Sequence, residues 1–310
     1  MSSIETTFTF GTEATFENLT IVPLLSRSSS EPDYDTLDAA LARGTLHITE
    51  VSESGHVPEI KVLNEGQRPV LIIDGEELVG AKQNRTVNLS ILIPATADVV
   101  VPVTCVEAGR WSHKPRSFAA SSRTHFATGR AAKSAQVSES LLRSGIARAD
   151  QSQVWNEIEQ KSARLQAHSA TSAMGDIFER QTNAVEAFVR GLPVVEHQVG
   201  AVFILDGEPK GVDLFDSPQT FRSLMPKILR GYALDAIDRR SNPLPGVSSS
   251  TANPGTKTVA DAFVRQVLEA PRTQFAAPGL GHTWRLFAPQ VAGGALMANG
   301  NLVHLSAFRV

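Results

Sequence analysis

Hydrophobic and polar residues alternate along several short segments, which is typical of β-strands with one buried face. Residues 5–26, 45–51 and 59–63 predict strands near the N-terminus. The clearest alternation runs through 85–94 and 98–107. In the first segment, one face holds Val87, Leu89, Ile91 and Ile93. In the second segment, one face holds Val99, Val101, Val103 and Cys105. We therefore predict two long strands here, each with an apolar face.

A second pattern repeats every three to four residues and predicts helices at 33–43, 153–166, 172–193, 217–240 and 258–270. Ser217 and Pro218 suit the N-cap and first position of the fourth helix. A last β-unit spans 282–308 around an Asn-Gly turn. The Ser-, Pro- and Gly-rich stretch 241–257 is predicted to be a linker or a long loop.

Two Asp-Gly dipeptides lie between apolar arms, which is a strong hairpin signal. They occur in VLIIDGEELVGAKQ (70–83) and VFILDGEPKGVDLF (202–215). The similarity fits an internal duplication, but Asp-Gly turn chemistry alone also produces such matches. Both explanations stay open.

These elements predict a single α+β domain over residues 1–310, with a mainly antiparallel β-sandwich or barrel-like core. Residues 1–111 form a first β-region, 112–192 a basic loop followed by a helical segment, and 193–310 a second β/α region. A chain of 310 residues is long enough to bury a core of normal size.

Composition suggests where the protein is located in the cell and shows that charge is unevenly distributed along the chain. The single cysteine excludes a disulfide within the chain, and residues 1–10 lack the pattern of a secretory signal, so we expect a cytoplasmic protein without membrane contact. Residues 1–66 hold eleven acids and three bases, whereas 113–149 hold seven bases and one acid. The basic segment can meet the acidic one or an anionic ligand.

Polar and charged residues are most concentrated between 68 and 111, among the predicted strands. Alternation places Gln83 and Arg85 on the apolar face of one strand, and Glu107 at the matching place on the next. A buried guanidinium is costly unless it is paired, so we predict an Arg85–Glu107 ion pair. The pair fits a structural role and an anion-binding role equally well.

The remaining polar residues extend this candidate site. Carboxylates suit ligand hydroxyls, general-base chemistry or a Mg²⁺ ion, and cationic side chains suit phosphate. The candidate catalytic residues are Glu76, Glu77 and Glu107, and the candidate ligand-binding residues are Asp74, Lys82, Gln83, Asn84, Arg85, Arg110 and Trp111. Trp111 can stack on a planar base or cap the core. The basic loop 112–133 is predicted to be mobile, either as a lid or as an ordinary exposed loop.

Common catalytic and nucleotide-binding motifs are absent. The sequence holds no GxxxxGK[ST], GxGxxG, HExxH or GxSxG pattern and no paired CxxC. The histidines show no metal-ligand spacing, and Cys105, in phase with valines, fits a core position. The basic segment lacks the aromatic residues and motifs of nucleic-acid binders, which disfavours a nucleic-acid partner.

Three blocks resemble the family named for its association with ADP-ribosylglycohydrolase and rhodanese-phosphatase proteins. They are DGEELVGAKQNR, VPVTCVEAGRW, and VGAVFILDGEPKGVDLF followed by FRSLMPKILRGYALDA, and the resemblance covers roughly residues 15–308. It implies a role in the metabolism of ADP-ribose, NAD-derived nucleotides or RNA ends. The residues that match the polar motifs of the family are Asp74, Glu76, Glu77, Lys82, Gln83, Asn84, Arg85, Glu107, Gly109, Arg110 and Trp111.

Residues and resemblance together predict a protein that binds or processes an anionic, nucleotide-like small molecule. If it is an enzyme, hydrolysis or another nucleotide-processing reaction is favoured. The alternatives are a non-catalytic nucleotide sensor and a protein-interaction scaffold with a structural polar network. The substrate, metal dependence and oligomeric state stay open.

Overall fold

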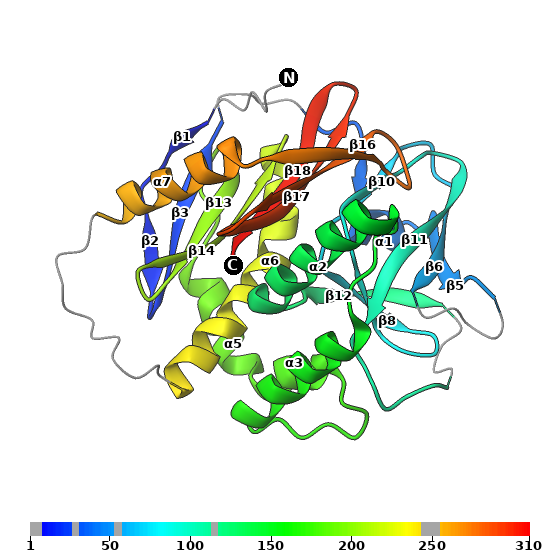
Figure 1. Ribbon diagram of the computed structural model, residues 1–310, viewed down its shortest axis with the longest axis horizontal. Coiled ribbons are helices and arrows are strands. Elements are labelled where there is room, and N and C mark those ends of the chain that lie inside the picture. The colour runs from blue at the N-terminus through cyan, green and yellow to red at the C-terminus, as the bar shows by residue number, and fades with distance from the viewer. Residues whose placement is uncertain (1–7, 27–30, 53–57, 113–116, 243–254) are drawn as a thin grey trace.

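The chain folds into three β-sheets and, among the described residues, seven helices (Figure 1). The computed structural model describes residues 8–26, 31–52, 58–112, 117–242 and 255–310. All strand pairs are antiparallel except β4 with β7. The predicted α+β class with a mainly antiparallel core is therefore confirmed. Most of the predicted linker 241–257 lies outside the described residues.

The largest sheet has nine strands and joins the two ends of the chain. β3 (Leu19–Leu25) pairs with β13 (Gln198–Leu205), so the N-terminal strands belong to the same sheet as the C-terminal ones. The order is β1 (Thr9–Phe10), β3, β13, β14 (Glu208–Phe215), β18 (Asn301–Arg309), β17 (Val291–Ala298), β16 (His282–Ala288) and β15 (Arg272–Ala276), with β2 (Ala14–Phe16) also on β3.

The second sheet curls into a half-barrel. Its order is β12 (Phe118–Thr124), β8 (Glu76–Gly80), β9 (Arg85–Val87), β11 (Ala97–Cys105), β6 (Glu59–Asn64) and β5 (Leu46–Glu50). An isolated bridge between Thr49 and Ser117 brings its two outer edges together. The third sheet is small and consists of β10 (Ile91–Ile93), β7 (Val70–Ile72) and β4 (Asp35–Thr36).

Two strand predictions in the first β-region are wrong. β7 and β8 flank the Asp74-Gly75 turn but enter different sheets, so residues 70–80 do not form a hairpin. The predicted strand 85–94 is likewise divided into β9 and β10, again in different sheets. The first break takes the chain from the small sheet to the half-barrel, and the second takes it back to the small sheet. By contrast, β13 and β14 form the predicted hairpin around Asp206-Gly207.

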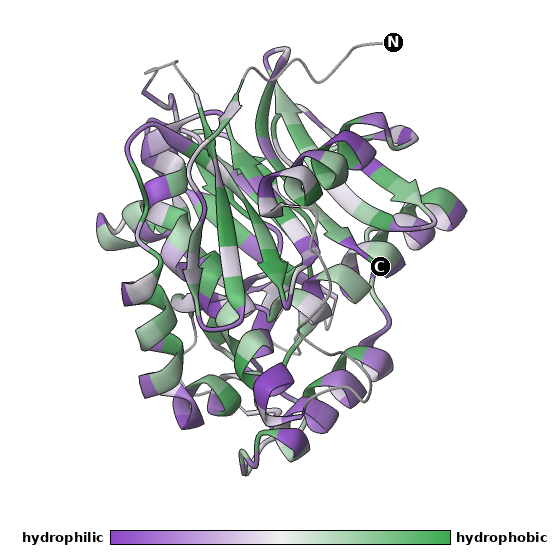
Figure 2. Cartoon of the chain, turned by 90° about the vertical axis from the view of Figure 1, so that its left-hand side faces the viewer, coloured by the Kyte–Doolittle hydropathy of each residue, from purple (hydrophilic) through white to green (hydrophobic). Residues whose placement is uncertain are grey.

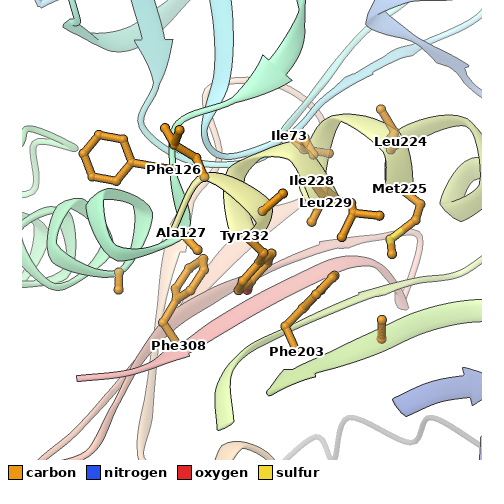
Figure 3. Packing of buried hydrophobic residues seen from close by; sticks show 14 of the residues in the cluster. Ile73, Phe126, Ala127, Phe203, Leu224, Met225, Ile228, Leu229, Tyr232 and Phe308 are labelled. Carbon is orange, nitrogen blue, oxygen red and sulfur yellow. The ribbon is translucent and has the colours of Figure 1, made fainter. Parts of the chain in front are cut away.

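Helices cover both faces of the nine-stranded sheet. α2 (Ala127–Ser144), α5 (Thr182–Gly191) and α6 (Pro218–Ser241) pack on one face, and α7 (Thr256–Glu269) packs on the other. α1 (Leu37–Ala42) packs on the half-barrel and the small sheet, while α3 (Gln151–Arg164) and α4 (Met174–Arg180) pack on each other, and α3 also contacts α2, α6 and β11. Ser217 caps α6 as predicted, accepting a hydrogen bond from the Gln219 amide. Tyr232 of α6 stacks on Phe203 of β13, with ring centroids 3.8 Å apart (Figure 3). Phe263 of α7 belongs to the separate cluster on the other face.

Hydropathy follows these layers. The strands are predominantly hydrophobic, whereas the peripheral helices alternate hydrophobic and hydrophilic segments (Figure 2). A third apolar cluster fills the half-barrel and contains Val87, Val101 and Val103, as the alternation predicts. The apolar faces of the predicted strands were therefore assigned correctly even where the strands are divided.

The predicted mobile basic loop is wrong for its described part. Residues 113–116 lie outside the described residues, but 118–124 form β12 and α2 begins at Ala127. Arg130 and Lys133 on α2 have no exposed surface. These two cations lie inside the molecule because buried carboxylates pair with them there.

Candidate functional site

Glu107 and Arg110 form a buried hydrogen-bond network just after β11. The Arg110 guanidinium donates to both carboxylate oxygens of Glu107, at 2.9 and 2.7 Å. Arg110 also donates to the Asn84 side chain and to three backbone carbonyls, while Glu107 accepts from Thr171 at 2.7 Å. Burial alone raises the pKa of Glu107, but the hydrogen bonds from Arg110, Thr171 and the Asn84 amide outweigh it and lower that pKa.

Arg85 does not pair with Glu107, so the predicted ion pair is wrong. Its guanidinium instead lies 3.5 Å from the carboxylate of Glu50, on β5, and donates to Gln83 at 3.0 Å. Cys105 is its cross-strand neighbour, and its sulfur also contacts the guanidinium. Gln83 lies in a bend just before β9, and its side-chain oxygen faces the Arg85 guanidinium. The wrong partner follows from the curl of the sheet, which brings β5 over β9.

Two nitrogens of the Arg85 guanidinium, Nε and one Nη, have no hydrogen-bond acceptor among the described residues. One carboxylate oxygen of Glu50 likewise has no hydrogen-bond donor among the described residues. The Arg85 side chain is fully buried. Buried donors usually find an acceptor, so these groups mark a place where the described polar network is incomplete.

Trp111 is the exposed feature beside this arginine. Half of its surface is accessible, at 49%. Lys82 and Arg85 approach its ring at 5.4 and 5.7 Å from the centroid, within the range of cation–π contact. Trp111 therefore lies at the surface with cationic groups beside it, and it does not cap the core.

Glu76 and Glu77 point to opposite faces of β8 and bind different cations. Glu76 accepts from Lys227 of α6 at 2.8 Å and from the Ile73 amide at 2.9 Å. Glu77 accepts from Arg123 of β12 at 2.6 Å. Burial raises the pKa of Glu77 even though Arg123 opposes the shift, and its Oε1 has no hydrogen-bond donor among the described residues.

Asp74 lies in another network, between the half-barrel and the nine-stranded sheet. Its carboxylate accepts from Lys133 at 2.5 Å and lies 3.7 Å from Arg130. Arg130 in turn binds both oxygens of Asp213 on β14, at 2.8 and 3.2 Å. The structure thus brings Gln83, Asn84, Arg85, Glu107, Arg110 and Trp111 together, and places Asp74 and Glu76 against other elements.

The network around Asp74 contains polar residues that the sequence did not single out. The Ser90 hydroxyl lies 2.7 Å from Nδ1 of His304, whose Nε2 lies 3.3 Å from Asp213. Arg285, also buried, donates to the hydroxyls of Ser134 and Ser138. The available signal was an isolated polar residue in an otherwise apolar strand, as in VDLF, LVHLS and TWRLF. No fixed spacing links these segments.

The described carboxylates do not form a shared cation site. Asp74, Glu76, Glu77 and Glu107 each pair with a different Lys or Arg side chain. No group of three His, Cys, Asp or Glu side chains with metal-binding geometry occurs in the described ranges. A Mg²⁺ ion at the candidate site would have to compete with these cations for the carboxylates.

A pocket of about 450 Å³ lies beside α3. Its wall includes His168, Ser169 and Ser172. The same loop carries Thr171, which donates to Glu107. The pocket therefore borders the Glu107–Arg110 network from outside.

These features define an α+β chain with a half-barrel, a large antiparallel sheet and polar networks built from buried ion pairs. The family model of the ARG and Rhodanese-Phosphatase-superfamily-associated Protein domain, ARPP-1, matches residues 7–308. The chain belongs to this family. Neither a curated protein nor a solved structure matches it. Among the described helices, none has the length and apolar character needed to cross a membrane.

Proposed function

We propose that this chain binds an anionic, nucleotide-like small molecule, such as ADP-ribose or another NAD-derived compound, around Trp111. The observation that carries the proposal is the incomplete hydrogen bonding of Arg85 next to the half-exposed Trp111 ring. Phosphate oxygens are suitable acceptors for guanidinium donors, and a tryptophan face stacks on a planar base. Because the Arg85 side chain is fully buried, a bound phosphate reaches it only if Trp111 moves aside.

The remaining candidate residues have separate roles in this proposal. Lys82, beside the ring, adds positive charge for the phosphate. Gln83 orients Arg85, while Asn84, Glu107 and Arg110 hold the strand ends in place. Asp74 and Glu76 stabilise the surrounding fold through Lys133 and Lys227.

If the ligand is hydrolysed, Glu77 is the best of the candidate carboxylates for general acid–base chemistry. Its pKa is raised by burial, and a carboxyl group with a raised pKa exchanges a proton more readily near neutral pH. Glu76 is less suitable because one of its oxygens accepts from Lys227 and the other from the Ile73 amide. Glu107 is less suitable because hydrogen bonds from Arg110 and Thr171 lower its pKa. The pairing of each candidate carboxylate with a Lys or Arg side chain also favours the second candidate function, a nucleotide sensor that binds without turnover.

Isothermal titration and thermal unfolding with ADP-ribose, AMP and inorganic phosphate test the proposal. A ligand at one hundred times its Kd stabilises the folded state by about 2.7 kcal/mol, so the melting temperature rises. We expect Trp111→Ala to weaken binding at least tenfold while leaving the melting temperature of the free protein nearly unchanged.

Trp284→Phe is the matched control, since Trp284 lies on β16 of the nine-stranded sheet and its ring faces Arg272. Binding that survives Trp111→Ala, or the absence of binding for all three compounds at millimolar concentration, contradicts the proposal. If binding occurs, turnover of ADP-ribose by the wild type and by Glu77→Gln separates the enzyme from the sensor.

A further inference from the structure

Ser90, His304 and Asp213 form a hydrogen-bonded chain inside the molecule. The Ser90 hydroxyl lies 2.7 Å from Nδ1 of His304, and Nε2 of His304 lies 3.3 Å from Oδ1 of Asp213. Ser90 precedes β10, whereas Asp213 and His304 lie on the paired strands β14 and β18. The three residues come from distant parts of the chain and meet only in the folded protein.

The partners of each atom determine the direction of the hydrogen bonds. Asp213 is held as a carboxylate because Arg130 and His304 lower its pKa against the effect of burial. A carboxylate only accepts, so Nε2 of His304 carries the proton and Nδ1 is the acceptor. Ser90 already accepts from the Asp74 amide at 2.9 Å, which leaves its own proton for Nδ1. His304 is therefore oriented as a base toward Ser90.

The surroundings hold this arrangement rigidly. Phe215 stacks on the His304 ring, with centroids 4.2 Å apart and planes 19° from parallel. Arg130 binds both oxygens of Asp213, and its guanidinium lies over the Phe308 ring at 4.9 Å. A nucleophile, a base and a group that orients the base are the three parts of an activated serine.

The formal charge beside Ser90 is positive. Arg130, Lys133 and Arg285 are three buried cations, and Asp74 and Asp213 are the two carboxylates that face them. Burial is the main reason that the pKa values of Lys133 and Arg285 are lowered, that of Arg285 to about 10. A negative charge that develops next to Ser90 would balance this excess.

Ser90 is also the most accessible point of its segment. It is 8% exposed, whereas every other residue from Thr86 to Ile93 is at most 3% exposed. Both hydrogen bonds of the hydroxyl are buried, so a substrate reaches it only where neighbouring side chains move, which favours a small acyl group.

We propose that Ser90 is the nucleophile of an ester-hydrolysing site that takes small acyl esters, with His304 as its general base and Asp213 as a positioning residue. This site is independent of the nucleotide-like ligand proposed above. The Ser90 Oγ forms a bond to the acyl carbon while its proton moves to Nδ1 of His304. The tetrahedral intermediate breaks the bond to the alcohol oxygen, which takes the proton from His304. Water then attacks the acyl-serine, passes one proton through His304 back to Ser90 Oγ, and releases the carboxylic acid.

Covalent labelling with phenylmethanesulfonyl fluoride tests the site in the full-length wild-type protein. Peptide mass spectrometry should find the adduct on Ser90, and p-nitrophenyl acetate hydrolysis should fall as the adduct accumulates. Ser90→Ala should lose both, whereas Ser306→Ala, a buried serine on the strand of His304, should keep both. No adduct on Ser90 of the wild type overturns the proposal, whatever the variants do.

The roles of the two partners need their own readout. We expect His304→Gln to slow labelling of Ser90 about a hundredfold, the usual contribution of a general base. Asp213→Asn should lower kcat for the ester while KM stays nearly constant. Melting temperatures identify any variant that fails to fold. A folded His304→Gln protein that is labelled at the wild-type rate excludes the relay.

Discussion

At the scale of single residues, the protein is characterised by buried charges that are paired one by one. Arg110 and Glu107 have side chains that are 6% and 4% exposed, and their two charges are satisfied mainly by each other and by the backbone. Removing one member of such a pair costs more than the pair contributes, because the other charge stays buried without a partner. This asymmetry makes Arg110 a test of the structural role of the network.

Arg110→Met should lower the free energy of unfolding by about 3 to 5 kcal/mol, since Glu107 would lose its cation. Urea denaturation measures the effect. In the double variant Glu107→Gln with Arg110→Met, part of the loss should be recovered.

The matched control is Arg265→Met, because Arg265 forms an i,i+4 pair with Asp261 and its side chain is 70% exposed. An exposed pair contributes less than about 1 kcal/mol. Equal losses for Arg110→Met and Arg265→Met would argue against a buried structural pair.

At the scale of elements, identical turn dipeptides lead to different connections. Asp206-Gly207 has left-handed φ values at both positions, 51° and 80°, and closes the β13–β14 hairpin. In Asp74-Gly75 only the glycine is left-handed, at 86°, and the chain leaves toward another sheet. The backbone of Gly75 also lies against the Arg130 side chain, so this glycine is required by packing as well as by conformation.

Gly75→Ala should therefore destabilise the protein more than Gly300→Ala. A Cβ at Gly75 would lie 2.7 Å from two atoms of Arg130, whereas one at Gly300, with a similar φ of 79°, meets nothing within 4 Å. We expect the Gly300 change to cost about 1 to 2 kcal/mol from the left-handed backbone, and the Gly75 change about 1 to 3 kcal/mol more from overpacking.

Chemical denaturation of both variants, with the wild type as reference, measures these costs. The explanation fails if Gly75→Ala is no less stable than Gly300→Ala.

At the scale of the whole molecule, a few polar contacts join the N-terminal β-region to α6. Lys227 of α6 binds Asp38 of α1 and Glu76 of β8, at 2.7 and 2.8 Å. Tyr34 donates to Asp216, just before α6, and lies 3.0 Å from Thr220. Burial raises the pKa of Asp216 from 3.8 to about 6, although the Tyr34 hydroxyl opposes the shift.

This shift makes the stability of the whole chain depend on pH. Between pH 3.8 and about 6, the folded protein keeps a proton on Asp216 that the unfolded chain releases. The stabilisation is thus complete below the lower value and is lost as the pH rises through about 6.

Asp216→Asn should remove this dependence. The difference in unfolding free energy between wild type and variant should move in favour of the variant from pH 4 to 7.5, by at most about 3 kcal/mol. Urea denaturation at several pH values measures it. A constant difference across the range contradicts the assignment to Asp216.

Much of the fold could be predicted from apolar residues that recur at every second position in strands and at every third or fourth position in helices. The alternating valines of β11, the Asn299-Gly300 turn between β17 and β18, and the capped start of α6 were predicted because each depends on residues close in the chain. β15 and the strand β12 were missed, since neither has a clear apolar face.

The candidate site was predicted in part. The sequence indicated that Arg85 and Glu107 point with the apolar residues of their segments, and both are buried, because alternation is local. It could not indicate that Arg85 faces Glu50, which is 35 positions earlier, since that contact depends on the curl of the half-barrel. The networks around Asp74 and Ser90 were out of reach for the same reason.

The sequence by itself determined the buried apolar faces of the strands, the start of α6 and the turns of two hairpins, because short-range periodicity and turn chemistry decide these. Only the tertiary structure decided which buried cation pairs with which carboxylate. A buried cation needs a carboxylate within a few ångströms, and the partners of Arg85, Lys133 and Lys227 lie in distant segments that the two large sheets bring together.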